Sequence, residues 1–276
     1  MNRAARIGFV GRWLATAAFL VAGAACAADK PAADKPADKP DCSRPLGLAL
    51  HDHGLLYSGA TGEGIDKDIA DELIRRSGCK IIVSVMPRAR IWQLIETGAL
   101  DFSLSGITNE SRDRFAAFAW YVSNKYYLLV HKDADVRSVA EFERNPALKL
   151  GVIRSFRYSA TANRLVDALD ADRRVSYATS LEPLYQVLLD KRVHAMIIEP
   201  FDYPSIERGK IRDQTMILAF DDPAVPHGLI MSRRSLSPEQ QQAWRALVDA
   251  MRADGSIRRI FEKYFTPDLA LAMTQF

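Results

Sequence analysis

The stretch IDKDIADELIRRSGCKIIVSV (residues 65–85) sets the fold class, because it changes from a helical to a strand pattern within a few residues. Ile65, Ile69 and Leu73 recur at four-residue steps, as on one face of an amphipathic helix. Asp66 stands in the first turn, where an acid suits the helix dipole. Gly78 ends the helix and the apolar run KIIVSV follows as a strand.

The same alternation extends in both directions. PLGLAL (45–50) precedes this stretch as a strand, and ARIWQLIETG (89–98) and DFSLSG (101–106) follow as a helix and a strand. A second block repeats the order, with strands at 148–153, 173–178, 194–199 and 215–220, helices at 159–170 and 180–192, and C-terminal helices at 237–255 and 257–265. Alternating strands and helices predict an α/β fold built on parallel strands with right-handed crossovers.

The first residues have the three-part pattern of a secretory signal peptide, with an arginine-rich start, an apolar run and small residues. We place the signal peptide at 1–27, with cleavage after Ala27 or alternatively after Ala24. Lipidation of Cys26 is the weaker alternative, because Gly23 stands where a branched apolar residue is expected. Residues 28–42 repeat Ala, Asp, Lys and Pro and predict a solvated linker.

The charge balance gives no support for a nucleic acid or a charged membrane as partner. The chain has 37 Lys and Arg against 34 Asp and Glu, and Arg3, Arg6 and Arg12 lie in the leader, which has no acid. The mature chain is therefore neutral.

Two cysteines remain after cleavage, Cys42 and Cys79, each just before a strand. A disulfide between them suits an oxidising compartment, and two separate buried thiols are the alternative.

Several motifs resemble the bacterial extracellular solute-binding proteins of the polar amino acid class, which serve ABC importers. They are GEGIDKDIADEL (62–73), WQLIETGALDFSLSGIT (92–108) with SRDRFAAF (111–118), DKRVHAMIIEP (190–200) and DGSIRRIFEKYF (254–265). The resemblance spans nearly all of residues 43–276.

The resemblance implies a two-lobed periplasmic binding protein fold, each lobe a mixed or parallel sheet flanked by helices. Lobe one is expected at 43–126 plus 232–276 and lobe two at 131–227. The β-like runs between the blocks, KYYLLVHKD and PHGLIMSRR, become two hinge strands. The ligand is expected in the cleft between the lobes, which closes by hinge bending.

Arg112 is the first candidate for ligand binding. In the family, the arginine after this turn grips the ligand's carboxylate, and a planar guanidinium suits that task because it makes two parallel charge-assisted bonds. Gly106 and the Thr108 hydroxyl are expected to add donors. A surface arginine paired with Glu110 or Asp113 is the alternative. The turn is one residue shorter than the common family form, which makes Arg114 a second candidate.

The family places an aspartate for the ligand's ammonium group after a second-lobe strand, and Glu199 stands at the matching position. The family's second-lobe turn of small residues is replaced by Arg154–Ser159. Within this turn Ser155 is expected to contact the ligand, and Arg157 either meets a second acid on it or remains solvated.

His51, Asp52 and His53 form only a weak metal pattern, because no further Cys or His stands nearby. The position of His51 in the loop after the first strand favours ligand contact instead. Tyr57 is expected to stack on an apolar ligand group, and Trp92 to do so or to belong to the core.

The sequence therefore predicts a monomeric periplasmic protein, without a cofactor, that captures an amino acid or related small carboxylate and delivers it to an ABC importer permease. A lyase resembling the periplasmic cyclohexadienyl dehydratases is one alternative, with Glu199 or His51 as proton carrier. A free-standing ligand sensor is another.

Overall fold

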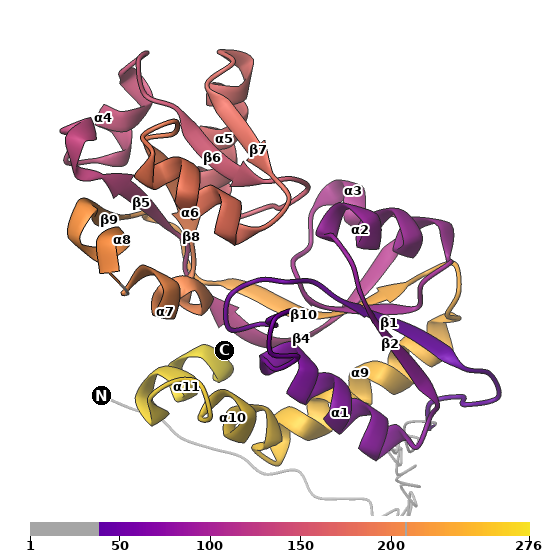
Figure 1. Ribbon diagram of the computed structural model, residues 1–276. Helices are drawn as coiled ribbons and strands as arrows, with labels where there is room; N and C mark the ends of the chain where they lie inside the picture. The colour runs from indigo at the N-terminus through magenta and orange to yellow at the C-terminus, as the bar shows by residue number, and fades with distance from the viewer. Residues whose placement is uncertain (1–38, 208) are drawn as a thin grey trace, which may run out of the picture. The chain divides into compact units, whose positions relative to one another are not determined.

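The structure is a computed structural model that describes residues 39–207 and 209–276. The predicted signal peptide, Cys26 and most of the predicted linker lie outside these ranges. The described chain forms two five-stranded sheets, each covered by helices, which confirms the α/β fold with two lobes (Figure 1).

The first sheet has the strand order β2-β1-β3-β10-β4. Its strands are β1 (Leu46–Leu50), β2 (Ile81–Val85), β3 (Phe102–Gly106), β4 (Ala116–Asn124) and β10 (Val225–Ser232). Strands β1, β2 and β3 are parallel, and β10 is antiparallel to both of its neighbours. The helices of this lobe are α1 (Ile65–Ser77), α2 (Arg88–Thr97), α3 (Glu110–Asp113), α9 (Pro238–Ala253), α10 (Ser256–Phe261) and α11 (Pro267–Thr274).

The second sheet repeats this plan with the order β7-β6-β8-β5-β9. Its strands are β5 (Tyr127–His131), β6 (Leu150–Ile153), β7 (Val175–Ala178), β8 (Ala195–Ile198) and β9 (Thr215–Ala219). Strand β5 is again the one antiparallel to both neighbours. The helices are α4 (Val139–Arg144), α5 (Ala160–Ala171), α6 (Leu181–Leu189), α7 (Tyr203–Ile206) and α8 (Gly209–Gln214), with single 3₁₀ turns at Lys132–Ala134 and Pro200–Asp202.

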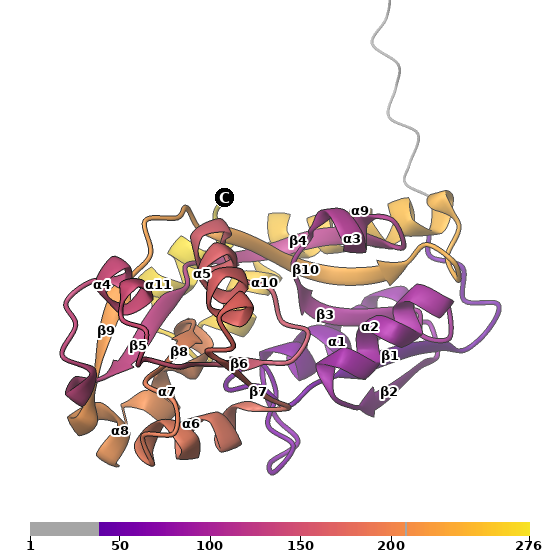
Figure 2. The ribbon, with the colours of Figure 1, turned by 90° about the horizontal axis from the view of Figure 1, so that it is seen from above.

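The chain passes between the two sheets at residues 125–126 and at residues 220–224. The two runs expected as hinges are whole strands of separate sheets, because β5 pairs only within the second sheet and β10 only within the first. Figure 2 shows β10 running alongside β3 and β4 in the first lobe. The crossing segments are therefore shorter than the expected hinge strands.

The disulfide between Cys42 and Cys79 is present, with the two Cα atoms 4.8 Å apart. Cys42 precedes β1 and Cys79 precedes β2, and these strands are parallel neighbours with Leu46 opposite Ile81. The two cysteines therefore stand at the same end of the sheet, as the sequence predicted.

Candidate functional site

Five polar residues that come after parallel strands lie close together at the carboxyl ends of both sheets. His51 follows β1, Arg88 opens α2 after β2, Ser105 lies at the end of β3, Ser155 follows β6 and Glu199 follows β8. Ligands of α/β sheets bind at this end of the strands, because the loops there carry the variable side chains.

A cavity lies at this junction, with a volume of about 10 Å³, roughly the space of one water molecule. Its lining comes from both lobes and consists of His51, Leu56, Arg88, Ser105, Ile107, Arg112, Tyr126, Phe156, Arg157, Glu199 and His227. Three of the eleven residues are arginines, and Glu199 is the one acid among them.

Arg112 is buried, with 7% of its surface exposed, and its guanidinium spans the two lobes. Nη1 donates to the carbonyl of Ile107 in the first lobe and Nη2 to the carbonyl of Ser155 in the second, both at 2.9 Å. The guanidinium carbon lies 3.9 Å from the centre of the Trp92 ring, a cation–π contact. Asn109 caps the short helix α3 by accepting from the Arg112 amide, which fixes the backbone.

No carboxylate lies within ion-pair distance of Arg112 in the described part of the chain. Burial, followed by repulsion from Arg88, lowers the pKa of Arg112 to about 9. The guanidinium still carries its charge at neutral pH, so a buried cation stands at the cavity without a counter-charge.

Arg88 is a second buried arginine at the cavity, and the sequence did not single it out. It donates from Nη1 to the carbonyl of Leu104 at 3.0 Å and from Nη2 to that of Ser105 at 2.9 Å. Its guanidinium carbon lies 5.3 Å from the ring centre of Trp92 and 5.9 Å from that of Phe156. Burial lowers the pKa of Arg88. The signal that could have found it is its place directly after the carboxyl end of a predicted parallel strand.

Glu199 is buried and both of its oxygens have partners. Oε1 lies 3.0 Å from Nε2 of His53, and Oε2 accepts from the Asn124 amide at 3.0 Å. Asp202 lies 3.6 Å from the same His53 nitrogen. Burial opposes the charged form of His53, but Asp202 and Glu199 outweigh it and raise the pKa of His53. Burial also raises the pKa of Glu199, but the hydrogen bond from His53 and the nearby histidines lower it overall.

His227 lies on the other side of Glu199, 3.6 Å from Oε2. Its Nδ1 is 2.9 Å from the carbonyl of Val225, which can only accept, so Nδ1 carries the proton. Nε2 then accepts from the Tyr126 hydroxyl at 2.7 Å. Burial lowers the pKa of His227 and favours this neutral form. The tautomer is thus set by a backbone carbonyl.

The second-lobe turn covers the cavity with an aromatic ring. Ser155 has a φ of 64° and offers its carbonyl to Arg112, while its side chain is exposed. The Phe156 ring centre lies 5.0 Å from that of His53 and 5.6 Å from that of His51. Arg157 reaches the cavity from the exposed side and lies 3.6 Å from Asp167.

His51 lies in the cavity wall and is 3% exposed. Neither of its ring nitrogens has a hydrogen-bond partner among the described residues. Burial, with Arg88 and His53 nearby, holds the pKa of His51 well below its usual range, so its ring is neutral.

Four of the predicted site residues are not part of the cavity lining, although Ser155 among them contacts a lining residue through its carbonyl, which accepts from Arg112. Tyr57 packs in the first-lobe core and pairs with the backbone of His53. Thr108 is exposed and its hydroxyl donates to Asp113. Gly106 lies beneath Ile230, where a Cβ would come within 2.4 Å of the Ile230 side chain. Within residues 39–207 and 209–276, no group of His, Cys, Asp and Glu is arranged to hold a metal ion.

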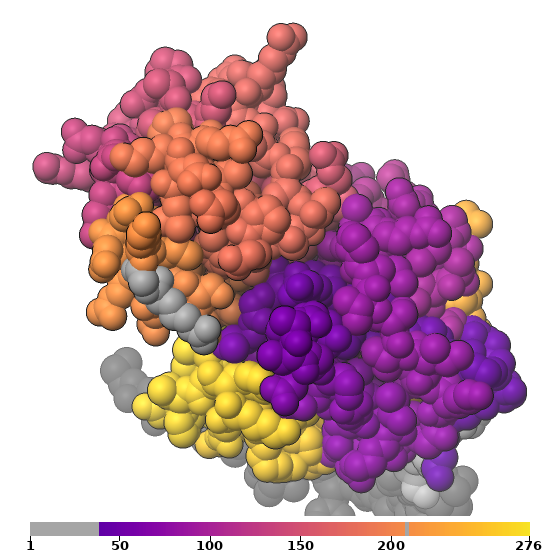
Figure 3. All heavy atoms as spheres, viewed as in Figure 1, coloured from indigo at the N-terminus to yellow at the C-terminus, as the bar shows by residue number. Residues whose placement is uncertain are grey.

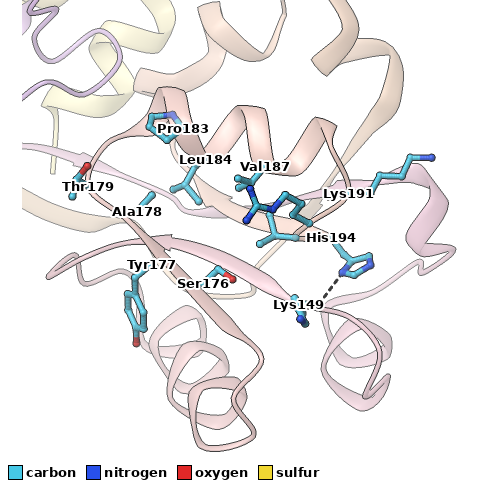
Figure 4. A pocket seen from close by; sticks show the side chains of 12 residues that line it. Lys149, Ser176, Tyr177, Ala178, Thr179, Pro183, Leu184, Val187, Lys191 and His194 are labelled. Carbon is cyan, nitrogen blue, oxygen red and sulfur yellow. Dashed lines mark hydrogen bonds between the residues drawn. The ribbon is translucent and has the colours of Figure 1, made fainter.

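A larger cavity, of about 760 Å³, lies beside β7 and α6 of the second lobe. Ser176 and Ala178 are small, and Leu184 and Val187 of α6 form the apolar side (Figure 4). The Lys149 amide donates to Nδ1 of His194 at the rim. The cavity is broad and draws on one lobe, and its lysines are exposed. The smaller cavity between the lobes is the better candidate, because buried charged groups converge on it.

Comparison with solved structures shows the same fold in other proteins. The arginine-, lysine-, histidine-binding protein ArtJ from Geobacillus stearothermophilus is 14% identical and has a TM-score of 0.67, over 80% of this chain and 95% of that one. EhuB in complex with hydroxyectoine is 16% identical, with a TM-score of 0.68 over 83% and 92%. The substrate-binding protein of an amino acid ABC transporter is 13% identical, with a TM-score of 0.63 over 80% and 99%. Comparison with curated protein sequences finds no match.

The fold is thus that of the two-lobed periplasmic binding proteins. The family model of the bacterial extracellular solute-binding proteins, family 3, matches residues 55–267, and the chain belongs to this family. The family recognised in the sequence is therefore confirmed. None of the helices in the described residues has the length and apolar character needed to cross a bilayer.

Proposed function

We propose that this protein captures an amino acid or a related small carboxylate solute between its two lobes and delivers it to an ABC importer in the periplasm. The observation that carries the proposal is the buried Arg112, which lacks a carboxylate partner and is held by carbonyls of both lobes. A ligand carboxylate would supply the missing counter-charge through charge-assisted hydrogen bonds.

The contacts of the site link ligand binding to the approach of the lobes. Arg112 of the first lobe bonds to Ser155 of the second, and His53 of the first lobe lies against Glu199 of the second. Hydrogen bonds to charged groups contribute about 1.5–3 kcal/mol each. A ligand that neutralises Arg112 removes the unfavourable term of a buried charge, so it favours the form in which the lobes meet.

The relatives support the class of ligand. The amino acids bound by ArtJ and the hydroxyectoine bound by EhuB each have a carboxylate. The transporter-associated neighbour supports delivery to an importer. A free-standing sensor would use the same site but pass the signal to a receptor instead.

The proposal is tested by thermal unfolding of residues 39–276 with amino acids and other small carboxylates. A ligand at a hundred times its Kd adds about 2.7 kcal/mol of stability, so the midpoint rises. We expect Arg112→Ala to abolish the rise. Arg174→Ala is the matched control, because Arg174 is also buried and also donates to backbone carbonyls, but far along the second lobe. This control should lower the midpoint and keep the rise. If the ligand raises the midpoint of both variants, Arg112 does not bind the ligand's carboxylate.

A lyase of the dehydratase type is the second candidate, and the buried pair of His53 and Glu199 favours it. The two groups are 3.0 Å apart beside the cavity, a geometry that permits proton transfer. Incubation with prephenate or arogenate tests it, and unchanged substrate after prolonged incubation would remove this candidate.

A further inference from the structure

We propose that the ligand carries two carboxylates and no ammonium group, so that the site selects a short dicarboxylate over a zwitterionic amino acid. This inference rests on the proposed function, since it assumes that the ligand lies at Arg112. It departs from the expectation that Glu199 accepts the ammonium group of an amino acid.

The first support is the pair of buried arginines that form no ion pair among the described residues. Arg88 and Arg112 are 6% and 7% exposed, and neither has a carboxylate within 4.0 Å in the described part of the chain. Their hydrogen bonds go to the carbonyls of Ile107, Ser155, Leu104 and Ser105 and to the Ser103 hydroxyl. Neutral acceptors do not cancel a buried charge. Asp66 and Glu199 act on Arg88 only from beyond ion-pair distance, so each guanidinium can still take a carboxylate in direct contact.

The second support is the position of the two arginines relative to each other. Both guanidinium carbons lie near the Trp92 ring, at 3.9 Å for Arg112 and 5.3 Å for Arg88. The distance between the two groups cannot exceed the sum of these values. A short dicarboxylate can span this distance, with one carboxylate on each guanidinium, once the lobes move apart and widen the cavity of about 10 Å³.

The third support is that Glu199 already has partners for its charge. His53 and Asn124 occupy its two oxygens at 3.0 Å, and His227 lies 3.6 Å away. Each oxygen can accept a further bond, but an ammonium group placed there would face Arg88 and Arg112 as well as Glu199. Repulsion by the two guanidinium groups would therefore oppose its binding.

His51 completes the arrangement. It lies in the cavity wall beside Arg88, is 3% exposed, and leaves both ring nitrogens unpartnered among residues 39–207 and 209–276. A neutral imidazole has one N–H that can donate to a carboxylate oxygen. The second carboxylate thus has a hydrogen-bond donor besides Arg88.

Isothermal titration at pH 7.5 with four matched ligands tests the inference. Succinate has two carboxylates, butyrate one, 2-aminobutyrate one with an ammonium group, and aspartate two with an ammonium group. We expect succinate to bind about ten- to a hundredfold more tightly than butyrate, the range expected for one added charged hydrogen bond. Aspartate should bind more weakly than succinate. A series from malonate to adipate then gives the preferred length.

Arg88→Gln tests whether Arg88 binds the second carboxylate, because glutamine keeps a hydrogen-bond donor and removes the charge. The preference for succinate over butyrate should fall to a few-fold, while butyrate still depends on Arg112. Arg90→Gln is the control, since Arg90 lies on the same helix as Arg88 but is exposed and donates to Gln93, and it should preserve the preference. The wild-type ligand ratios test the inference even if the Arg88 variant does not fold.

Two results would overturn the inference in distinguishable ways. Tighter binding of 2-aminobutyrate than of succinate, with dependence on Arg112, would leave the proposed function standing and refute the dicarboxylate. If no carboxylate binds in the titrations and none raises the unfolding midpoint, the result would count against the proposed function as well.

Discussion

At the scale of single residues, the molecule holds a buried proton-binding group across its lobe junction. His53 faces Glu199 and Asp202, with Arg88 and the neutral His51 also close to it. Burial alone would lower the pKa of His53, but the two acids raise it overall. Burial raises the pKa of Asp202 to about 7, and Glu199 adds to the rise. A change of pH near neutrality therefore acts directly on the contact between the lobes.

The sign of the pH dependence follows from these shifts. The pKa of His53 is raised on folding, so its contribution to stability is full below the unfolded value of about 6.5 and is lost as pH rises through the folded pKa. Asp202 acts in the same direction between about pH 4 and 7. The lowered pKa of Glu199 acts oppositely, but only at acid pH, where its contribution is lost as pH falls.

We therefore predict that the free energy of unfolding falls as pH rises above about 6.5, by at most about 1.4 kcal/mol per pH unit for the one proton of His53. His53→Gln should flatten this part of the curve. Urea unfolding at closely spaced pH values measures the slope. His194→Gln serves as control, because His194 lies at the start of β8 outside the cluster. An unchanged slope in the His53 variant would refute the assignment.

Sequence reasoning named some residues of the candidate site and missed others. Arg112 and Glu199 follow strand ends in recognisable motifs, and both line the cavity. Arg88 was missed because it looks like the solvated first residue of a helix. Asp66 was interpreted as an acid at a helix start, yet it is buried and accepts from the Ser105 hydroxyl at 2.6 Å. These roles depend on contacts between distant segments, which periodicity does not reveal.

At the scale of elements, the periodic segments were predictable and the segments without a period were not. The strands next to amphipathic helices are where the pattern placed them. Strand β4 was missed, because AAFAWYVSN is buried along nearly its whole length and so has no alternation. The helix α11 was also missed. It is short, and its tertiary contacts with α10 and β4 account for it better than local propensity does.

The disulfide gives a prediction at this scale. Cys42 and Cys79 are 37 positions apart and enclose β1 and α1. Closing a loop of this length restricts the unfolded chain, and the entropic relation gives a stabilisation of about 4 kcal/mol, at the upper end of the usual 2–4 kcal/mol. We expect the double variant Cys42→Ser, Cys79→Ser to lose about 2–4 kcal/mol in urea unfolding. Reductant should reproduce the loss in the wild type and leave the variant unaffected. Equal stability of the two proteins would contradict a structural role for the disulfide.

At the scale of the whole molecule, an apolar contact joins the lobes besides the two crossing segments and the polar contacts of the site. Phe201 follows β8 of the second sheet, but its side chain is fully buried in the first-lobe core, with ring centres 6.3 Å from Phe261 and 5.9 Å from Phe265. The Leu55 amide donates to its carbonyl at 2.9 Å. Gly54 permits this approach, because its φ is 49° and a Cβ would come within 2.3 Å of that carbonyl.

Figure 3 shows the surfaces that meet around this contact, with the segment after β1 in indigo, the C-terminal helices in yellow and the second-lobe segment in orange. The Phe201 ring belongs to the second lobe by its place in the chain but packs in the core of the first. The stability of each lobe therefore depends on the other. Hinge motion is then expected to leave Phe201 in place and to occur on the side of Arg112 and Ser155, where the contacts are polar hydrogen bonds.

Phe201→Ala tests whether this ring couples the lobes. The three tryptophans of the described chain, Trp92, Trp120 and Trp244, all belong to the first lobe, so their fluorescence follows that lobe, whereas far-UV circular dichroism follows both. In the wild type the two unfolding curves should coincide. The free energy of unfolding of the variant should fall by about 3–5 kcal/mol, as expected for a buried Phe→Ala change, and its two curves should separate.

Phe142→Ala is the control. It removes an equally buried ring from the second-lobe core and should lower stability while the two curves still coincide. Coincident curves in the Phe201 variant would show that the crossing segments and the polar contacts couple the lobes without this ring.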